Sequence, residues 1–354
     1  MLPDDEVMRL PRRATGLVIA AWLLCVAGPG RASEEVDAWK ATCERAKEVP
    51  LPAADQPDAA TREALKGCHS EELFYGIGRP SDPTKARQCA FVERAAGDGE
   101  VFGGSAILMS IYATGLGAAQ NLDLALRFVC EVEGAPAEIE GRMAHLEKVK
   151  HAQGSKRGGK IEFDLCDDVT SGFMMGHCAA HQQRMEAAKR DKRYAARVSK
   201  WTAAEKAAFQ KLRAAASEFI QARSANEVDL GGTARAALQI EEEESLESAF
   251  DKILDELDRG ALRPATDAEL VDVDRKLNAS YKLVMKAASP TDWGTVTKEG
   301  IREAERKWPK YRDAWAAFVK VKYPKVDPVS VKVRVTRERT DNLDAFAPAD
   351  ATAK

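Results

Sequence analysis

The chain has 354 residues, of which 45% are hydrophobic and 31% are charged. This composition supplies enough apolar side chains for a sizeable core and excludes a collagen-like or largely disordered chain. The formal net charge of -3 gives no global positive field, so nucleic acid and anionic lipid are not expected partners. The length is sufficient for two or three domains.

Residues 1–32 have the pattern of a secretory signal peptide. Three arginines precede an apolar run at residues 17–27, and small residues follow at Gly30 and Ala32. An uncleaved anchor is the alternative, but the run is shorter than the span of about 20 residues that a membrane helix needs. We therefore expect export to the periplasm or the medium, with no stable membrane span after cleavage.

Cleavage after Ala32 removes Cys25 and leaves six cysteines. An even number of cysteines in an exported chain predicts disulfide bonds, although counting cannot choose among the 15 pairings of six residues. The six are Cys43, Cys68, Cys89, Cys130, Cys166 and Cys178.

The mature chain begins with a helical pattern at residues 34–47. The following segment, VPLPAADQPDAA, contains three prolines and is expected to be a loop. A helical pattern resumes at Thr61 and runs to Tyr75.

A repeat of 39 residues follows. Gly76 and Gly78 match Gly115 and Gly117, and two further pairs also match, Asp82 with Asn121 and Ala86 with Ala125. Paired glycines turn the chain, Asp or Asn caps the next helix, and a small alanine lets helices approach closely. A period of this length indicates stacked helical hairpins.

The repeated residues resemble Sel-one-like repeats, relatives of the tetratricopeptide repeat, over about residues 61–147. The resemblance implies a short α-solenoid at residues 33–149 that makes protein contacts rather than performing catalysis. Cys89 and Cys130 lie in the second helices of adjacent repeats, so we expect them to be bonded. Cys43 and Cys68 would then form the remaining pair.

Residues 150–163 are expected to be a basic, glycine-containing linker. A long helical region follows at residues 164–260. Thr202 and Glu205 form a capping box before an apolar stripe, and Gly231–Gly232 separates that helix from the next. A second helical unit at residues 264–345 begins with another capping box, at Thr266 and Glu269.

The second unit contains an amphipathic helix at residues 302–318. Its large apolar residues fall three or four positions apart, and burial in the core is favoured over exposure as a recognition stripe. Pro309 is expected to kink the helix. A fainter echo of the helix lies 89 positions earlier, around Phe219. Residues 330–335, SVKVRV, alternate as a short strand or an extended segment would, and residues 346–354 are expected to be a disordered tail.

Three features resemble the LprI-type family, which is named for a lysozyme-inhibiting lipoprotein. They are the Cys166–Cys178 motif, the sequence LNASY at residues 277–281 and the helix reading AERKWPKYRDA. The family-motif residues of that helix are Glu305, Arg306, Trp308, Tyr311, Arg312 and Asp313. Because the cysteines precede residue 260 and this helix follows it, the resemblance implies two degenerate copies, at residues 164–260 and 264–345.

His177 and His181 are one helical turn apart and could bind a metal ion together with Cys166 and Cys178. In an oxidising compartment the Cys166–Cys178 disulfide is favoured instead, because it consumes both sulfurs. We therefore expect no metal and no cofactor.

No catalytic motif is found in a suitable context, so the chain is not expected to be an enzyme. The expected fold is all-α, with a short α-solenoid followed by antiparallel long-helix bundle units. The family resemblance implies an exported protein-binding protein of the cell envelope that inhibits a lysozyme. A periplasmic structural adaptor is the alternative, and a metal-binding module is a third reading. The sequence does not predict an oligomeric state.

Overall fold

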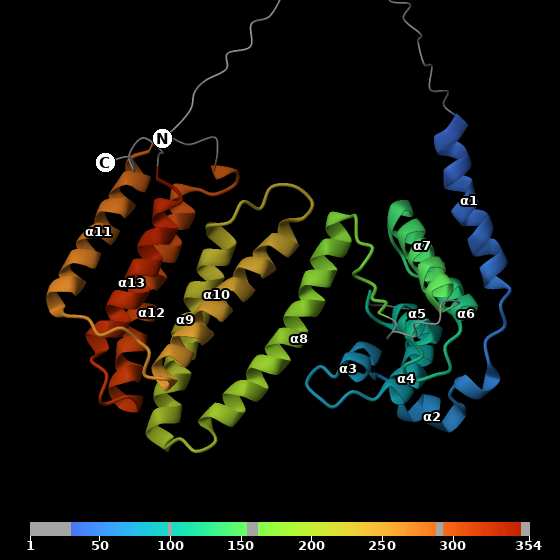
Figure 1. Ribbon diagram of the computed structural model, residues 1–354, viewed down its shortest axis with the longest axis horizontal. Coiled ribbons are helices and arrows are strands. Elements are labelled where there is room, and N and C mark those ends of the chain that lie inside the picture. The colour runs from blue at the N-terminus through green and yellow to red at the C-terminus, as the bar shows by residue number, and fades with distance from the viewer. Residues whose placement is uncertain (1–29, 98–100, 154–161, 288–292, 348–354) are drawn as a thin grey trace, which may run out of the picture.

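The computed structural model describes residues 30–97, 101–153, 162–287 and 293–347. Within these ranges the chain forms thirteen α-helices and one 3-10 turn and contains no strand, which confirms the all-α prediction. The helices form an N-terminal group and a C-terminal group, and the long helix α8 lies between them (Figure 1).

The N-terminal group consists of helices of 6 to 18 residues and one 3-10 turn. They are α1 (Gly30–Lys47), η1 (Ala53–Asp55), α2 (Ala59–Ala64), α3 (Ser70–Tyr75), α4 (Pro83–Ala96), α5 (Gly104–Thr114), α6 (Leu122–Val129) and α7 (Pro136–Gln153). The expected helix from Thr61 to Tyr75 is in fact broken between α2 and α3. Gly67 lies in that break with a φ of 69°, a conformation that ends a helix without strain.

The two hairpins α3–α4 and α5–α6 have the same turn geometry. The Asp82 amide donates to the Leu73 carbonyl over 2.8 Å, and the Asn121 amide donates to the Tyr112 carbonyl over 3.0 Å. The two hydrogen bonds therefore join equivalent positions of the 39-residue repeat. A Cβ on Gly117 would lie 2.4 Å from the Pro83 carbonyl oxygen, so this glycine allows the second turn to stack on the first helix pair.

The three disulfides join Cys43 to Cys130, Cys68 to Cys89, and Cys166 to Cys178. The third pair agrees with the expectation, whereas the expected Cys89–Cys130 and Cys43–Cys68 pairs were wrong. Cys130 follows Cys89 by 41 positions instead of 39, and two residues correspond to about 200° around a helix. The two cysteines therefore face different neighbours: Cys89 meets the segment before α3, and Cys130 meets α1.

Six long helices follow: α8 (Gly172–Val198), α9 (Ala203–Asn226), α10 (Arg235–Asp258), α11 (Asp267–Lys286), α12 (Lys298–Lys322) and α13 (Pro328–Asp344). The capping boxes expected at Thr202 and Thr266 begin α9 and α11. The antiparallel helices α9 and α12 make the most extensive contact of the molecule. Around this central pair, α8 packs along α10 and α11 packs along α13.

Two hydrophobic clusters organise the described residues. The first includes Cys166, Met174 and Cys178 together with the N-terminal helices, and the second includes Tyr194 and Val198 together with α9–α13. The clusters thus meet within α8, whereas the sequence placed the boundary in the linker at residues 150–163. Residues 150–153 of that linker belong to α7, and residues 154–161 lie outside the described residues.

Residues 330–335 belong to α13, so the strand or extended segment expected there was wrong. The Asp327 side chain accepts from the Val329 amide, and Pro328 occupies the first turn, where its missing N–H costs nothing. Because α13 packs against both α11 and α12, valines on more than one of its faces are buried. An alternating pattern can therefore arise from a helix with two neighbours.

Both ends of the chain lie partly outside the described residues. This is the case for residues 1–29 of the expected signal peptide and residues 348–354 of the expected tail. Phe346, which was assigned to that tail, instead packs edge-on against Trp293 with ring centroids 5.6 Å apart. None of the helices in the described part combines the length and apolar content that a membrane crossing requires.

Peptide mapping of the oxidised protein under non-reducing conditions tests the disulfide pattern. We expect one proteolytic product that links Cys43 to Cys130 and another that links Cys68 to Cys89, since their Cα atoms are 5.3 and 6.0 Å apart. Recovery of a Cys89–Cys130 product as the main species would contradict the packing of α1 against α6.

Candidate functional site

The apolar residues of the family-motif helix lie in the core of the C-terminal group. Trp315 is fully buried, and Trp308 and Tyr311 are 3% and 8% exposed. The Tyr311 ring stacks on Phe219 of α9, with centroids 5.0 Å apart, so the expected echo packs against the helix that it resembles. The prediction that this stripe forms core is confirmed.

The space beside the stripe is too small for an organic ligand. A cavity of about 20 Å³ lies among Trp308, Tyr311 and Arg339, which is room for about one water molecule. The helix continues through Pro309, whose side chain is exposed. The aromatic residues therefore stabilise the fold and do not line a binding pocket.

A buried charge network joins α12 to α13 and to the end of α9. Arg339 donates two hydrogen bonds to Glu227, over 2.6 and 2.7 Å, and a third to Glu305 over 2.6 Å. Burial opposes the charge of Arg339, but the hydrogen bonds to Glu227 and the nearby Glu305 outweigh it and raise the arginine pKa. Burial also raises the pKa of Glu305, an effect that Arg339 partly offsets.

The remaining motif residues make ion pairs nearer the surface. Arg306 contacts Glu299 over 2.7 Å, and Arg312 contacts Asp274 of α11 over 3.0 Å. Asp313 lies 3.3 Å from Lys332 of α13. Within the motif, Glu305 therefore belongs to a buried network, whereas Arg306 and Asp313 pair with neighbouring charges at the surface.

The two candidate metal-binding histidines have separate environments. The His181 ring is 3% exposed, stacks on Phe102, and places Nδ1 2.6 Å from the Glu71 carboxylate of α3. The His177 ring instead contacts Phe173, with centroids 4.4 Å apart. His181 thus ties α8 to the N-terminal group.

The cysteine sulfurs expected to complete a metal site are joined in the Cys166–Cys178 disulfide. In the part of the chain that the structure describes, potential metal ligands converge at Cys68, Cys89 and Glu93. The sulfurs of that group are also bonded to each other. Neither group offers a set of thiolate ligands while its disulfide is intact.

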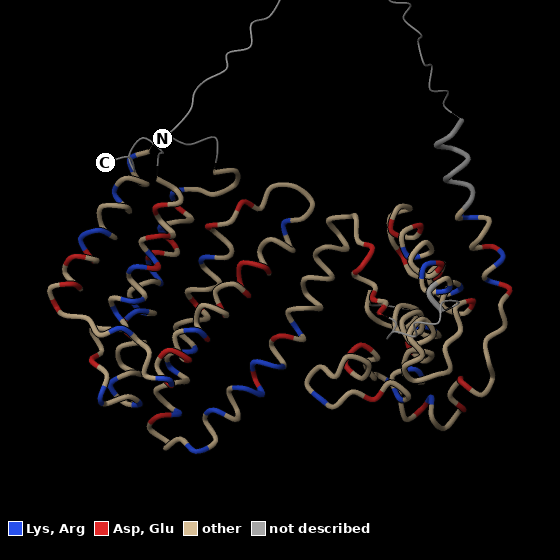
Figure 2. The backbone as a smooth tube through the Cα atoms, viewed as in Figure 1, with Lys and Arg blue, Asp and Glu red and all other residues tan. Residues whose placement is uncertain are grey.

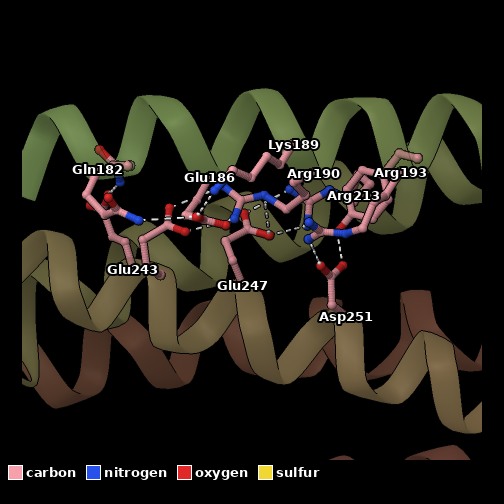
Figure 3. Close-up of polar contacts among 12 residues, drawn as sticks. Gln182, Glu186, Lys189, Arg190, Arg193, Arg213, Glu243, Glu247 and Asp251 are labelled. Carbon is pink, nitrogen blue, oxygen red and sulfur yellow. Dashed lines mark hydrogen bonds and ion pairs between the residues drawn. The ribbon is translucent and has the colours of Figure 1, made fainter. Parts of the chain in front are cut away.

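The contact between α8 and α10 is rich in ion pairs (Figure 3). Arg190 lies 2.9 Å from Glu244, and Arg193 lies 2.7 Å from Asp251. Arg213 of α9 joins the same interface by a two-bond contact with Glu247, over 2.7 and 2.8 Å. Figure 2 shows the basic residues gathered along the C-terminal half of α8. The ion pairs therefore fix the position of α8 relative to α10.

A comparison with protein families identifies one segment of the chain. Residues 258–343 match the family model of the lysozyme inhibitor LprI. The LprI match covers α11, α12 and α13 with their connections, about a quarter of the chain, and includes the whole family-motif helix. No curated protein and no solved structure matched the chain.

Sequence reasoning missed the partners that hold the LprI segment in place. Arg339 and Glu227 lie 112 positions apart, and charged residues in an amphipathic pattern are normally assigned to the surface. Glu71, which receives contacts from His181 and Arg184, was missed for the same reason. The one available signal was that Arg223 and Glu227 are four residues apart, a spacing that suits an ion pair.

Substitution of Arg339 tests the buried network. Arg339→Met should lower the free energy of unfolding by about 3–5 kcal/mol, because Glu227 would remain buried without the two hydrogen bonds that Arg339 donates. Arg306→Met removes an exposed charge from the same helical group and should change the free energy of unfolding by no more than about 0.5 kcal/mol. Urea unfolding followed by circular dichroism measures both, and equal stabilities of the two variants would contradict the network.

The contact that Glu71 of α3 makes with His181 and Arg184 of α8 should make the stability of the protein depend on pH in the acid range. Burial raises the pKa of Glu71, but the hydrogen bonds from His181 and Arg184 outweigh burial, so the pKa lies below the ordinary glutamate value of 4.5. Its stabilising contribution is therefore present above about pH 4.5 and lost as the pH falls through the folded-state value. Glu71→Gln should reduce the loss of stability between pH 5 and pH 3, relative to the parent protein, in urea unfolding. An unchanged acid dependence would contradict this role.

Proposed function

We propose that the chain is an exported protein-binding protein of the cell envelope that inhibits a lysozyme. The observation that carries this proposal is the LprI match at residues 258–343. The matched segment includes a complete motif helix whose aromatic residues are buried. A protein contact would then use the exposed side of the domain.

Export is supported by the cysteine chemistry. One disulfide joins α1 to the end of α6, and a second joins the segment before α3 to α4. The third joins the segment before α8 to that helix. Such bonds persist in oxidising compartments and are rare in reducing ones. Together with the signal-peptide pattern at residues 1–32, they favour the periplasm or the medium as the place of action.

The most suitable contact residues in the LprI segment surround Pro309 on α12. Arg306 and Asp313 have side chains that are 55% and 59% exposed, and they lie on either side of the proline. Pro309 has no backbone N–H. The carbonyl of Glu305, four residues earlier, therefore receives no hydrogen bond from it within the helix. We assign the contact with lysozyme to this exposed part of α12.

A duplication of the LprI unit would account for the arrangement of the long helices. The pair α8 and α10 corresponds to the pair α11 and α13, with α9 and α12 in contact at the centre. In both outer pairs the helices run parallel, because the intervening helix returns the chain. This correspondence supports two degenerate copies, at residues 164–260 and 264–345.

An adaptor role is the second candidate. The matching turns of the α3–α4 and α5–α6 hairpins favour it, because they support the assignment of Sel-one-like repeats to residues 33–149. Helical repeats of this type provide surfaces for protein contacts. In this role the LprI segment would enlarge the scaffold without acting on lysozyme.

A lysozyme assay separates the two candidates. Added to lysozyme that is digesting a cell-wall suspension, the oxidised protein should slow the loss of turbidity as its concentration rises, with binding in the micromolar range. No slowing at micromolar excess, combined with retention of other envelope proteins in a pull-down, would favour the adaptor and refute the inhibitor.

Two double variants test the contact residues. Arg306→Ala with Asp313→Ala should weaken inhibition about tenfold, equivalent to about 1.4 kcal/mol. The matched control is Arg275→Ala with Asp272→Ala, which removes an exposed pair of the same charges from α11. Equal inhibition by both variants would place the contact elsewhere.

A further inference from the structure

A groove runs along the contact between α8 and α10, outside the LprI match. The helices approach closely at two glycines: a Cβ on Gly172 would lie 2.4 Å from the Thr233 carbonyl carbon, and one on Gly176 would lie 3.1 Å from the Ala236 Cβ. Beside this contact the helices border an open groove of about 430 Å³. That volume is within the range of protein binding sites, about 300–1,000 Å³.

Each helix contributes one face to the groove. The α8 residues lie three, four and seven positions after the first of them, and the α10 residues follow the same spacing, which places each set on a single helical face. The two sets are Met175, Cys178, Ala179 and Gln182 on α8, and Ala237, Ile240, Glu241 and Glu244 on α10. The Cys166–Cys178 disulfide fixes the wall at the start of α8. The groove is therefore built on rigid elements.

The groove changes from apolar to acidic along its length. Met175, 42% exposed, and Ile240 lie toward the apolar end, whereas the glutamates follow further along α10. Glu244 forms an ion pair with Arg190, whereas Glu241 forms none with the residues that the structure describes. The described lining contains no lysine or arginine. The acidic end is thus complementary to a cation.

We propose that this groove binds an amphipathic helix of a partner protein that presents aliphatic side chains followed by a lysine or arginine. Two helices that border a groove commonly receive a third, whose apolar face enters between them. Met175 and Gln182 are seven positions apart on α8, a rise of about 10 Å, so the aliphatic and basic residues of the partner are about seven helical positions apart.

The proposal follows from the lining and does not rest on lysozyme inhibition. The exposed methionine provides an adaptable apolar contact, and the glutamate at the far end sets the direction in which the partner helix lies. The groove thereby selects both a composition and an orientation. A helix with the reversed order of residues would place its cation at the apolar end.

Methyl NMR of the oxidised protein with three helical peptides tests the groove. The first peptide, of about 15 residues, carries two leucines and, about seven positions on, two lysines. The second replaces the lysines by glutamate, and the third replaces the leucines by alanine. We expect the first alone to shift the methyl signals of Met175 and Ile240 at millimolar concentration or below.

Glu241→Lys should weaken binding of the first peptide about tenfold. Glu63→Lys on α2 is the matched control, because it changes the net charge equally at a distant, exposed position. Three results would overturn the proposal: no methyl shifts with the first peptide, equal shifts with the acidic peptide, or equal affinities of the two variants. If the protein fails to inhibit lysozyme but binds the first peptide as expected, the groove assignment stands.

Discussion

The packing of α9 against α12 is the contact on which the C-terminal group depends. Phe209 meets Phe318 near one end of the pair, and Phe219 meets Trp308 and Tyr311 near the other. These rings fill the space between the two antiparallel helices, and the outer helices pack around them. Burial of large aromatic side chains stabilises each contact by a few kcal/mol, so the pair forms the centre of the core.

The interface of α8 with α10 depends on a different kind of contact. Its residues are joined largely by ion pairs, including Arg190 with Glu244 and Arg193 with Asp251. Partly exposed ion pairs contribute little to stability but fix the register of the two helices, because they follow one another along both helices, from Arg190 with Glu244 to Arg197 with Asp255. Since α8 also contributes His181 to the N-terminal group, this register determines how the two groups are joined.

The sequence predicted the features that depend on local pattern. The spacing of Trp308, Tyr311 and Trp315 was sufficient to predict a buried helical face, and the capping boxes at Thr202 and Thr266 marked true helix starts. Features that depend on contacts between residues far apart in the sequence could not be predicted from local pattern. The Cys43–Cys130 bond joins residues 87 positions apart, and the helical state of residues 330–335 depends on two neighbouring helices. Of the motif residues, those in the core were placed correctly, whereas the Arg339 network was not foreseen.

The Cys43–Cys130 bond also changes the covalent topology of the N-terminal group. It closes a ring that contains both repeated hairpins, and the Cys68–Cys89 bond forms a smaller ring within it. A single peptide-bond cleavage inside the larger ring therefore leaves the two pieces covalently attached. In a compartment that contains proteases, a nicked protein can keep its repeats together until the disulfide is reduced.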